Sequence, residues 1–221
     1  MDDAPRQKTF LLAAPEARVL EWLARRLPAR VMPDHMTVLG VLAAVGIGVA
    51  YALSSDPVWL WVASGLLVVH WVGDSLDGTL ARVRRIQRPG YGYYLDHLVD
   101  AGATIVIGVG LGLSPHMGVV TGLAIVIAYL ALSINTYLET HVFGVFSLGY
   151  GRFGPTEARV GLIALNTALA CGLTYNVAGL SIIDLAGLGI AGLMVTALGV
   201  RAARNLRVLA AREPAGQVRP A

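Results

Sequence analysis

The chain has 221 residues, of which 56% are hydrophobic and only 14% are charged. This composition excludes an ordinary soluble domain, in which about a quarter of the residues carry charge. The net charge of +3 is modest and its basic residues cluster between apolar runs, so no nucleic-acid partner is expected. We predict an all-α integral membrane protein.

The first expected element is an amphipathic helix at residues 15–31 that lies in the membrane interface. The segment is too charged to span a bilayer, and three arginines share one face: Arg18, Arg25 and Arg26. The opposite face carries an apolar stripe, made of Val19, Leu20, Trp22, Leu23 and Leu27. This pattern is typical of an interfacial helix, with a soluble amphipathic helix as the alternative. No removable signal peptide is expected before it.

Six apolar runs follow, each close to the roughly 20 residues that a helix needs to cross the hydrocarbon layer. They are expected at residues 36–54, 57–80, 93–114, 117–140, 156–176 and 180–201. Six Lys and Arg precede the first run, four lie between the second and third, two flank the fourth-to-fifth connection and five follow the sixth. The alternate connections contain none, so both termini are predicted to be cytoplasmic in an integral cell-membrane protein.

Small residues mark two of these runs. Gly108 and Gly112 form a GxxxG pattern, and Gly187, Gly189 and Gly192 lie along the sixth run. Such faces permit close helix packing in lipid. The packing could be within the bundle or between two subunits.

Four aspartates lie at the facing ends of the second and third runs. Asp74 and Asp77 are three residues apart, and Asp96 and Asp100 are four apart, so each pair shares one helix face. A charged residue in a membrane helix costs about 2.5 to 3.5 kcal/mol on insertion scales, and these need compensation. Carboxylates from two meeting helices would form a set of hard oxygen ligands suited to Mg²⁺ or Mn²⁺.

Small and basic residues follow the first acidic pair. Gly78 and Ala81 leave room for a ligand to approach the backbone, and Arg82 can bind a phosphate through two N–H groups. The predicted orientation places these groups and the aspartates at the cytoplasmic face, where a soluble nucleotide could reach them.

The spacing of these residues resembles a family signature. The pattern DxxDGxxAR, then nine residues, then GxxxDxxxD runs from Asp74 to Asp100. It is similar to the signature of the CDP-alcohol phosphotransferases (CDP-alcohol phosphatidyltransferases), membrane enzymes of phospholipid synthesis. All eight positions are present, although many members have eight residues between the positions of Arg82 and Gly92. The segment from Pro33 to Thr37 also resembles the Pro-Asn-x-x-Thr entry common in the family, with Asp34 replacing Asn.

The resemblance implies a reaction in which a hydroxyl of an acceptor alcohol attacks the β-phosphorus of a CDP-linked donor and releases CMP. The metal ligands implied are Asp74, Asp77, Asp96 and Asp100. Two ions are expected, because a paired-metal site suits in-line displacement between two oxygens. Asp100 is also the expected general base. CDP contacts are expected from Gly78, Ala81, Arg82 and Gly92, the last by allowing close helix approach. A homodimer is implied as well.

We therefore expect one membrane catalytic domain over residues 1–221, with the interfacial helix at 15–31, a six-helix bundle at 36–201 and a tail at 213–221.

Further substrate contacts are expected from a set of polar residues that border the aspartates: Arg84, Arg85, Arg88, His97, Glu139, Arg152, Thr156, Glu157 and Arg159. The arginines also satisfy the positive-inside rule, and Thr156 with Glu157 also suits a helix start. His70 and Trp71 are expected to serve packing or the interface.

The sequence leaves alternatives for the two substrates and for the class of membrane protein. The Asp96-His97 step and the Thr156-Glu157 pair weakly resemble the branch that uses CDP-choline or CDP-ethanolamine, which favours a CDP-amino-alcohol donor and a diacylglycerol-type acceptor. The alternative is CDP-diacylglycerol with a polar alcohol. A cation transporter would hold its acids near the midplane on broken helices, and an inactive scaffold relative would lack a motif aspartate. Both fit the sequence less well.

Overall fold

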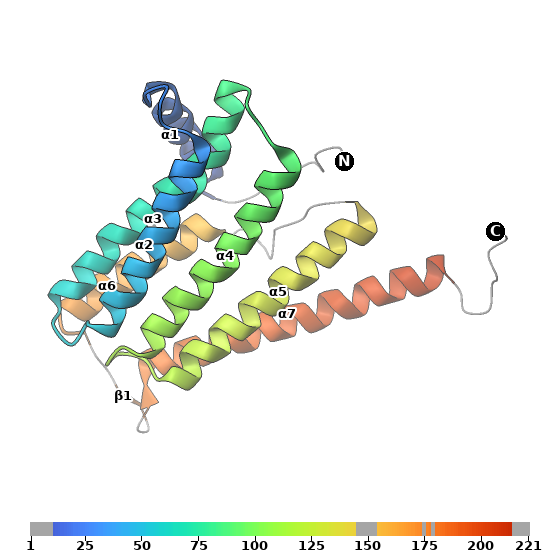
Figure 1. Ribbon diagram of the computed structural model, residues 1–221. Coiled ribbons are helices and arrows are strands. Elements are labelled where there is room, and N and C mark those ends of the chain that lie inside the picture. Colours follow the sequence, from blue (N-terminus) through green and yellow to red (C-terminus); the bar gives the residue numbers. More distant parts are fainter. Residues whose placement is uncertain (1–10, 145–153, 174–175, 178–179, 214–221) are drawn as a thin grey trace.

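Helices make up nearly all of the part of the chain that the structure describes, residues 11–144, 154–173, 176–177 and 180–213 of a computed structural model (Figure 1). They are α1 (Ala13–Arg26), α2 (Pro33–Ala52), α3 (Val58–Arg84), α4 (Pro89–Gly112), α5 (Val119–Phe143), α6 (Pro155–Ala170) and α7 (Ile182–Arg212). Two short antiparallel strands, β1 (Asn176–Val177) and β2 (Leu180–Ser181), precede α7, with Asn176 opposite Ser181. The all-α prediction is confirmed, and the strand pair was not predicted.

Five of the described helices are long and apolar enough to cross a membrane: α2, α3, α4, α5 and α7. They correspond to five of the six predicted runs. All five extend past one of their predicted boundaries, and at their C-terminal ends α3 continues to Arg84 and α7 to Arg212. The added residues are rich in arginine, so these ends reach past the apolar layer.

The fifth predicted run is shorter than expected. α6 has 16 residues, about 24 Å at 1.5 Å per residue, whereas the hydrocarbon layer is about 30 Å thick. Its end is set by Gly172, which has a left-handed φ of +79°. The N–H of Gly172 donates to Leu169 O at 2.9 Å and that of Leu173 to Ala168 O at 3.0 Å, a Schellman ending. The helix therefore ends six residues before the predicted boundary at residue 176. Six full-length spans are not seen among the described residues.

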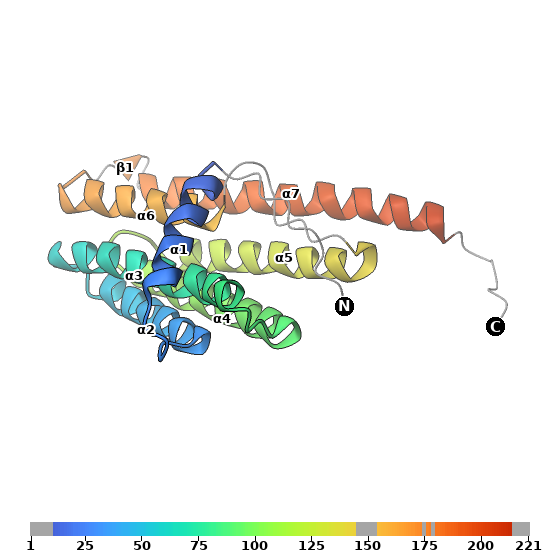
Figure 2. The same ribbon diagram turned by 90° about the horizontal axis from the view of Figure 1, so that it is seen from above.

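The spanning helices pack in an order that differs from their order in the chain. α3 contacts α2 and α6, α2 also contacts α4, and α5 contacts α4 and α7. Seen from above, α3 and α5 lie between α2 and α4 on one side and α6 and α7 on the other (Figure 2). This arrangement brings the end of α3 beside the beginnings of α2 and α4.

Glycines allow the closest helix contacts. A Cβ added at Gly110 would lie 2.4 Å from the carbonyl oxygen of Gly48, where α4 crosses α2. One added at Gly122 would lie 2.7 Å from Gly108 O and 2.9 Å from the Cα of Gly112. The GxxxG pattern therefore packs α4 against α5 within one subunit. Along α7, an added Cβ meets neighbours at Gly187, whereas at Gly189 and Gly192 nothing described lies within 4 Å.

The contact between α2 and α3 gives a first prediction. A Cβ at Gly73 would lie 2.5 Å from Gly40 N and 2.8 Å from Met36 O, and backbone cannot move aside cheaply. Gly73→Ala should therefore lower the melting temperature in detergent, by the equivalent of about 1 to 3 kcal/mol or more for an overpacked site. Gly65→Ala is the matched control on the same helix, since nothing lies within 4 Å there. Equal melting of the two variants would contradict this packing.

α1 lies across the bundle rather than along it (Figures 1 and 2). Leu20 and Ala24 are buried against a cluster on α2 and α3 that consists of Met36, Leu76 and Leu80. Two members of the predicted stripe are not part of this contact face, because Val19 is 47% exposed and Trp22 is 51% exposed. The helix also ends at Arg26, earlier than the predicted residue 31. α1 is thus amphipathic as predicted, but its packed face is rotated toward Ala24.

Candidate active site

The predicted acidic residues come together where the end of α3 meets the start of α4. Asp74 and Asp77 lie on α3, and Asp96 and Asp100 lie on α4. Carboxylate oxygens of Asp74, Asp96 and Asp100 all lie within 4.8 Å of one another, and all three side chains are partly buried. Three of the four aspartates therefore form one compact cluster, which we call the aspartate cluster.

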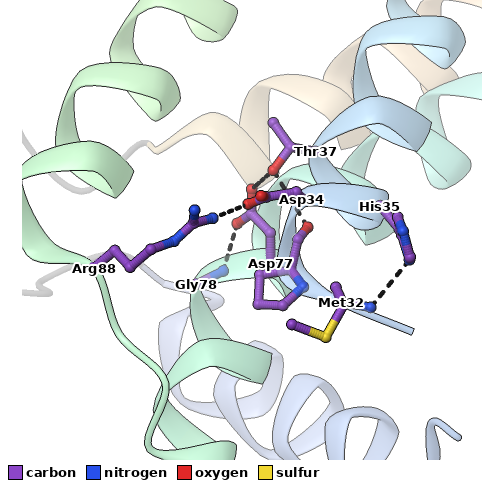
Figure 3. Close-up of polar contacts among 8 residues, drawn as sticks. Met32, Asp34, His35, Thr37, Asp77, Gly78 and Arg88 are labelled. Carbon is purple, nitrogen blue, oxygen red and sulfur yellow. Dashed lines mark hydrogen bonds and ion pairs between the residues drawn. The ribbon is translucent and has the colours of Figure 1, made fainter. Parts of the chain in front are cut away.

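Asp77 lies at the edge of the aspartate cluster. Its Oδ2 accepts a hydrogen bond from the Thr37 hydroxyl of α2 at 2.7 Å, and its Oδ1 accepts one from the Gly78 N–H at 2.5 Å (Figure 3). It lines the same small pocket as Asp74 and Asp96. Thr37 therefore fixes the orientation of this carboxylate.

The aspartate cluster fits a hard divalent cation. Ligands on opposite sides of Mg²⁺ are about 4.2 Å apart, twice the usual 2.0 to 2.1 Å bond, so oxygens within 4.8 Å of one another need only small shifts to share an ion. All the donors are carboxylate oxygens, as Mg²⁺ and Mn²⁺ prefer. Three such groups at this separation repel one another unless a cation offsets their charge.

One positive side chain already reaches the aspartate cluster. Arg159 of α6 donates from Nη2 to Asp74 Oδ2 at 2.5 Å, and the two side chains are only 13% and 19% exposed. Charge-assisted hydrogen bonds of this kind are stronger than neutral ones. Arg159, one of the predicted substrate contacts, is therefore bonded directly to a motif aspartate.

The predicted CDP contacts lie on the same helices. Arg82 bends back along α3, where its Nη2 donates to Thr79 Oγ1 at 3.0 Å, and its Nη1 lies 3.4 Å from the position of a Cβ added at Gly78. Ala81 is on the same turn and is partly buried. Gly92 was expected to allow close helix approach, and this is wrong, because no described atom lies within 4 Å of an added Cβ. Gly92 instead leaves open space one turn before Asp96.

Two predicted substrate contacts have structural partners instead. Arg84 donates to four backbone carbonyls between α1 and α2, those of Leu27, Pro28, Ala29 and Val31. Glu139 is buried between α5 and α7, where it accepts from Asn135 at 2.7 Å, from Asn205 at 2.5 Å and from Arg201. These contacts fix the chain before α2 and join α5 to α7.

Thr156 and Glu157 also have partners, on or beside α1. The Thr156 hydroxyl donates to Glu16 Oε1 at 2.9 Å, and Glu157 accepts from the N–H groups of Leu12 and Gly154, both at 2.9 Å. The Glu157–Gly154 contact is the expected helix-start contact, whereas the other two contacts join α6 to α1 and the residue before it. Glu16 accepts further hydrogen bonds from α3, from Trp71 Nε1 at 2.9 Å and Ser75 Oγ at 3.3 Å.

The two arginines between α3 and α4, Arg85 and Arg88, differ in their contacts. Arg88 forms an ion pair with Asp34 at the start of α2 (Figure 3) and lies 4.0 Å from the centre of the Tyr91 ring. Arg85 is exposed and has a left-handed φ of 58°, where α3 ends. Of the remaining predictions, Arg152 and residues 214–221 of the predicted tail lie outside the described residues.

His97 packs between α4 and α5. Its ring centre lies 4.1 Å from that of Tyr93 and 4.6 Å from that of Tyr137, and its Nδ1 is 2.7 Å from Tyr93 O. The same nitrogen is 3.7 Å from Asp96 Oδ2. The side chain therefore borders the aspartate cluster from within an aromatic contact.

Sequence reasoning missed His70. It was expected to serve packing or the interface, but it lines the pocket together with Thr37, Gly40, Asp74, Asp77, Asp96 and Val99. The pocket holds about 10 Å³ of free volume, close to the space of one water molecule. The available signal was spacing, because His70 lies four residues before Asp74 and so on the same face of α3.

Comparison with known proteins agrees with this geometry. A sequence model of the CDP-alcohol phosphatidyltransferase family matches residues 30–200, which include every helix from α2 to α6 and most of α7. The chain belongs to this family. It is also 32% identical over 140 residues to a CDP-diacylglycerol--serine O-phosphatidyltransferase of Encephalitozoon cuniculi. That match covers 58% of this chain and 35% of the relative, so the chain corresponds to about a third of the relative's length.

Proposed function

We propose that this protein transfers a substituted phosphate group from a CDP-linked donor to the hydroxyl of an acceptor alcohol and releases CMP. The observation that carries the proposal is the aspartate cluster, which the family signature supplies from two helices. Phosphoryl transfer from a pyrophosphate depends mainly on positioning and on offsetting negative charge. A compact set of carboxylates suited to divalent cations fits that task.

Each side chain has a proposed part in this reaction. Asp74, Asp77, Asp96 and Asp100 would hold two Mg²⁺ or Mn²⁺ ions, which supply charge neutralisation at the pyrophosphate when bound. Asp100 would also accept the proton of the attacking hydroxyl. Gly78, Ala81 and Arg82 would bind the CDP group, and the open space at Gly92 lies where that group would pass.

We also propose the orientation and assembly of the protein. The end of α3, the start of α4 and both termini would face the cytoplasm, since the basic residues cluster on that side. The short α6 would be the sixth span, with local thinning of the bilayer. A homodimer would use surfaces outside the α4–α5 crossing, because the GxxxG pattern there is already packed.

Two substrate pairs are candidates. The Asp96-His97 and Thr156-Glu157 resemblance favours a CDP-amino-alcohol donor with a diacylglycerol-type acceptor, but Thr156 and Glu157 are engaged by Glu16, Leu12 and Gly154. The serine phosphatidyltransferase relative favours CDP-diacylglycerol with a small polar alcohol. We place this second pair first on the evidence of the relative.

The test is a direct assay. The purified protein is reconstituted in lipid with Mg²⁺ and offered CDP-diacylglycerol with polar alcohols, and separately CDP-choline or CDP-ethanolamine with diacylglycerol. CMP release with one pair, absent in an Asp96→Asn control, supports the proposal and identifies the substrates. A folded protein that releases no CMP from either donor class would overturn it.

Arg82 provides a prediction within this function. Lys cannot copy the planar guanidinium that binds two phosphate oxygens at once, so Arg82→Lys should weaken binding of the CDP donor by about tenfold. Its contact with Thr79 is exposed, so the fold should persist. Calorimetric titration of the donor measures the effect, with Arg25→Lys, at an exposed arginine of α1, as the control. Unchanged donor affinity in Arg82→Lys would remove this residue from the site.

A further inference from the structure

His70 is a buried side chain with an unmet hydrogen-bonding group. It is only 5% exposed, and its Nδ1 has no hydrogen-bond partner within the described part of the chain. Leaving a buried polar atom unpaired is costly, so such an atom in a native fold calls for an explanation. The ring lines the pocket that Asp74, Asp77 and Asp96 also line, which points to a partner that enters this pocket.

The position of His70 indicates which group enters. His70 lies one turn before Asp74 on α3, and Asp100 lies one turn after Asp96 on α4. The end of α3 and the start of α4 are neighbours, so both residues lie toward the interior of the bundle, on the inner side of the other aspartates. The proposed CDP contacts, from Gly78 to Arg82, lie on the opposite, outer side. In an in-line displacement the attacking oxygen arrives opposite the leaving group.

We propose that His70 is a positioning residue whose Nδ1–H donates a hydrogen bond to the attacking hydroxyl of the acceptor alcohol. This inference rests on the proposed function. The acceptor oxygen forms a bond to the β-phosphorus of the donor, the bond from that phosphorus to the CMP oxygen breaks, and the hydroxyl proton passes to the Asp100 carboxylate. The pocket has room for about one oxygen-sized group, which suits a hydroxyl rather than a whole headgroup.

The identity of the unpaired atom makes the test sharp. The side-chain amide of Asn lies close to the place of His Nδ1, whereas the longer Gln side chain brings its amide near Nε2. His70→Asn should keep the acceptor KM within about threefold of the parent, and His70→Gln and His70→Phe should raise it by about tenfold or more. The KM of the CDP donor and its metal-dependent binding should stay the same in all three variants.

Stability provides an independent readout. Since Phe replaces a buried nitrogen without a partner by an apolar ring of similar shape, His70→Phe should melt at the same temperature as the parent or higher. A merely structural histidine would instead lose stability in this variant. A lower melting temperature together with an unchanged acceptor KM would overturn the inference.

The outcomes separate the two proposals. If the parent protein releases no CMP with any donor and acceptor, the proposed function fails. If the parent is active and Gln behaves like Asn, the assignment of Nδ1 to the acceptor hydroxyl is wrong. A change confined to donor KM would likewise overturn it, because His70 would then contact the donor phosphate. If the His70→Phe variant does not fold, the acceptor KM of His70→Asn compared with that of His70→Gln still tests the inference.

Discussion

Asp100→Asn should keep metal-dependent binding of the CDP donor and lose turnover by about 10²-fold or more, the scale of a general base. Asn has nearly the same shape as Asp and still offers an oxygen to a cation, but it cannot take a proton at neutral pH. The side chain shares the aspartate cluster with Asp74 and Asp96, so its geometry should survive the change. Donor binding by calorimetry and single-turnover CMP release measure the two effects separately.

The matched control for Asp100 is Asp77→Asn. Asp77 already accepts hydrogen bonds from Thr37 and Gly78, and an amide in its place could accept only through its one oxygen. Donor binding and turnover should therefore fall together. If Asp100→Asn turns over within about threefold of the parent, a different group takes the proton. His97 would be tested next, since Glu157 is held by the N–H groups of Leu12 and Gly154.

Removal of divalent cations should abolish CMP release, and added Mg²⁺ or Mn²⁺ should restore it. Oxygens of three carboxylates within 4.8 Å of one another repel without a cation, and Arg159 offsets only part of that charge. A cation that binds the folded state alone also stabilises it, by about 2.7 kcal/mol at a hundredfold excess over its Kd. The melting temperature should therefore rise with Mg²⁺ concentration.

The control for this metal effect is Asp96→Asn, which removes one carboxylate from the aspartate cluster. Its melting temperature should respond much less to Mg²⁺ than that of the parent. Full CMP release by the parent in excess EDTA would contradict the prediction outright. A Mg²⁺ response that is equal in both proteins would show that the cation binds elsewhere.

Local spacing was enough to predict which residues share a helix face. The three- and four-residue intervals of the aspartates led to the cluster, and apolar runs led to five of the helices that could span a membrane. Contacts between distant segments could not be predicted this way. Arg84 reaches carbonyls more than 50 residues earlier in the chain, and its charge alone fits a phosphate contact equally well.

The end of α6 and the place of His70 were predicted wrongly, although the sequence near each residue held a signal for the correct answer. Gly172 marks the end of α6, yet the apolar residues around it were read as a continuing run. His70 shares the face of Asp74, but a histidine beside a tryptophan is also common at membrane interfaces. Only the packing of α2 against α3, with Asp96 and Val99 of α4 lining the same pocket, shows that this face is buried.

The contacts of Glu16 have a mechanical consequence. One carboxylate oxygen of α1 accepts from Trp71 and Ser75 on α3 and from Thr156 on α6. Separating α3 from α6 at this end would break at least one of these hydrogen bonds. We therefore expect the two helices to move together. The ion pair between Arg159 and Asp74 also joins α6 to α3. We therefore expect a lipid substrate to reach the site from the bilayer between other helices than α3 and α6.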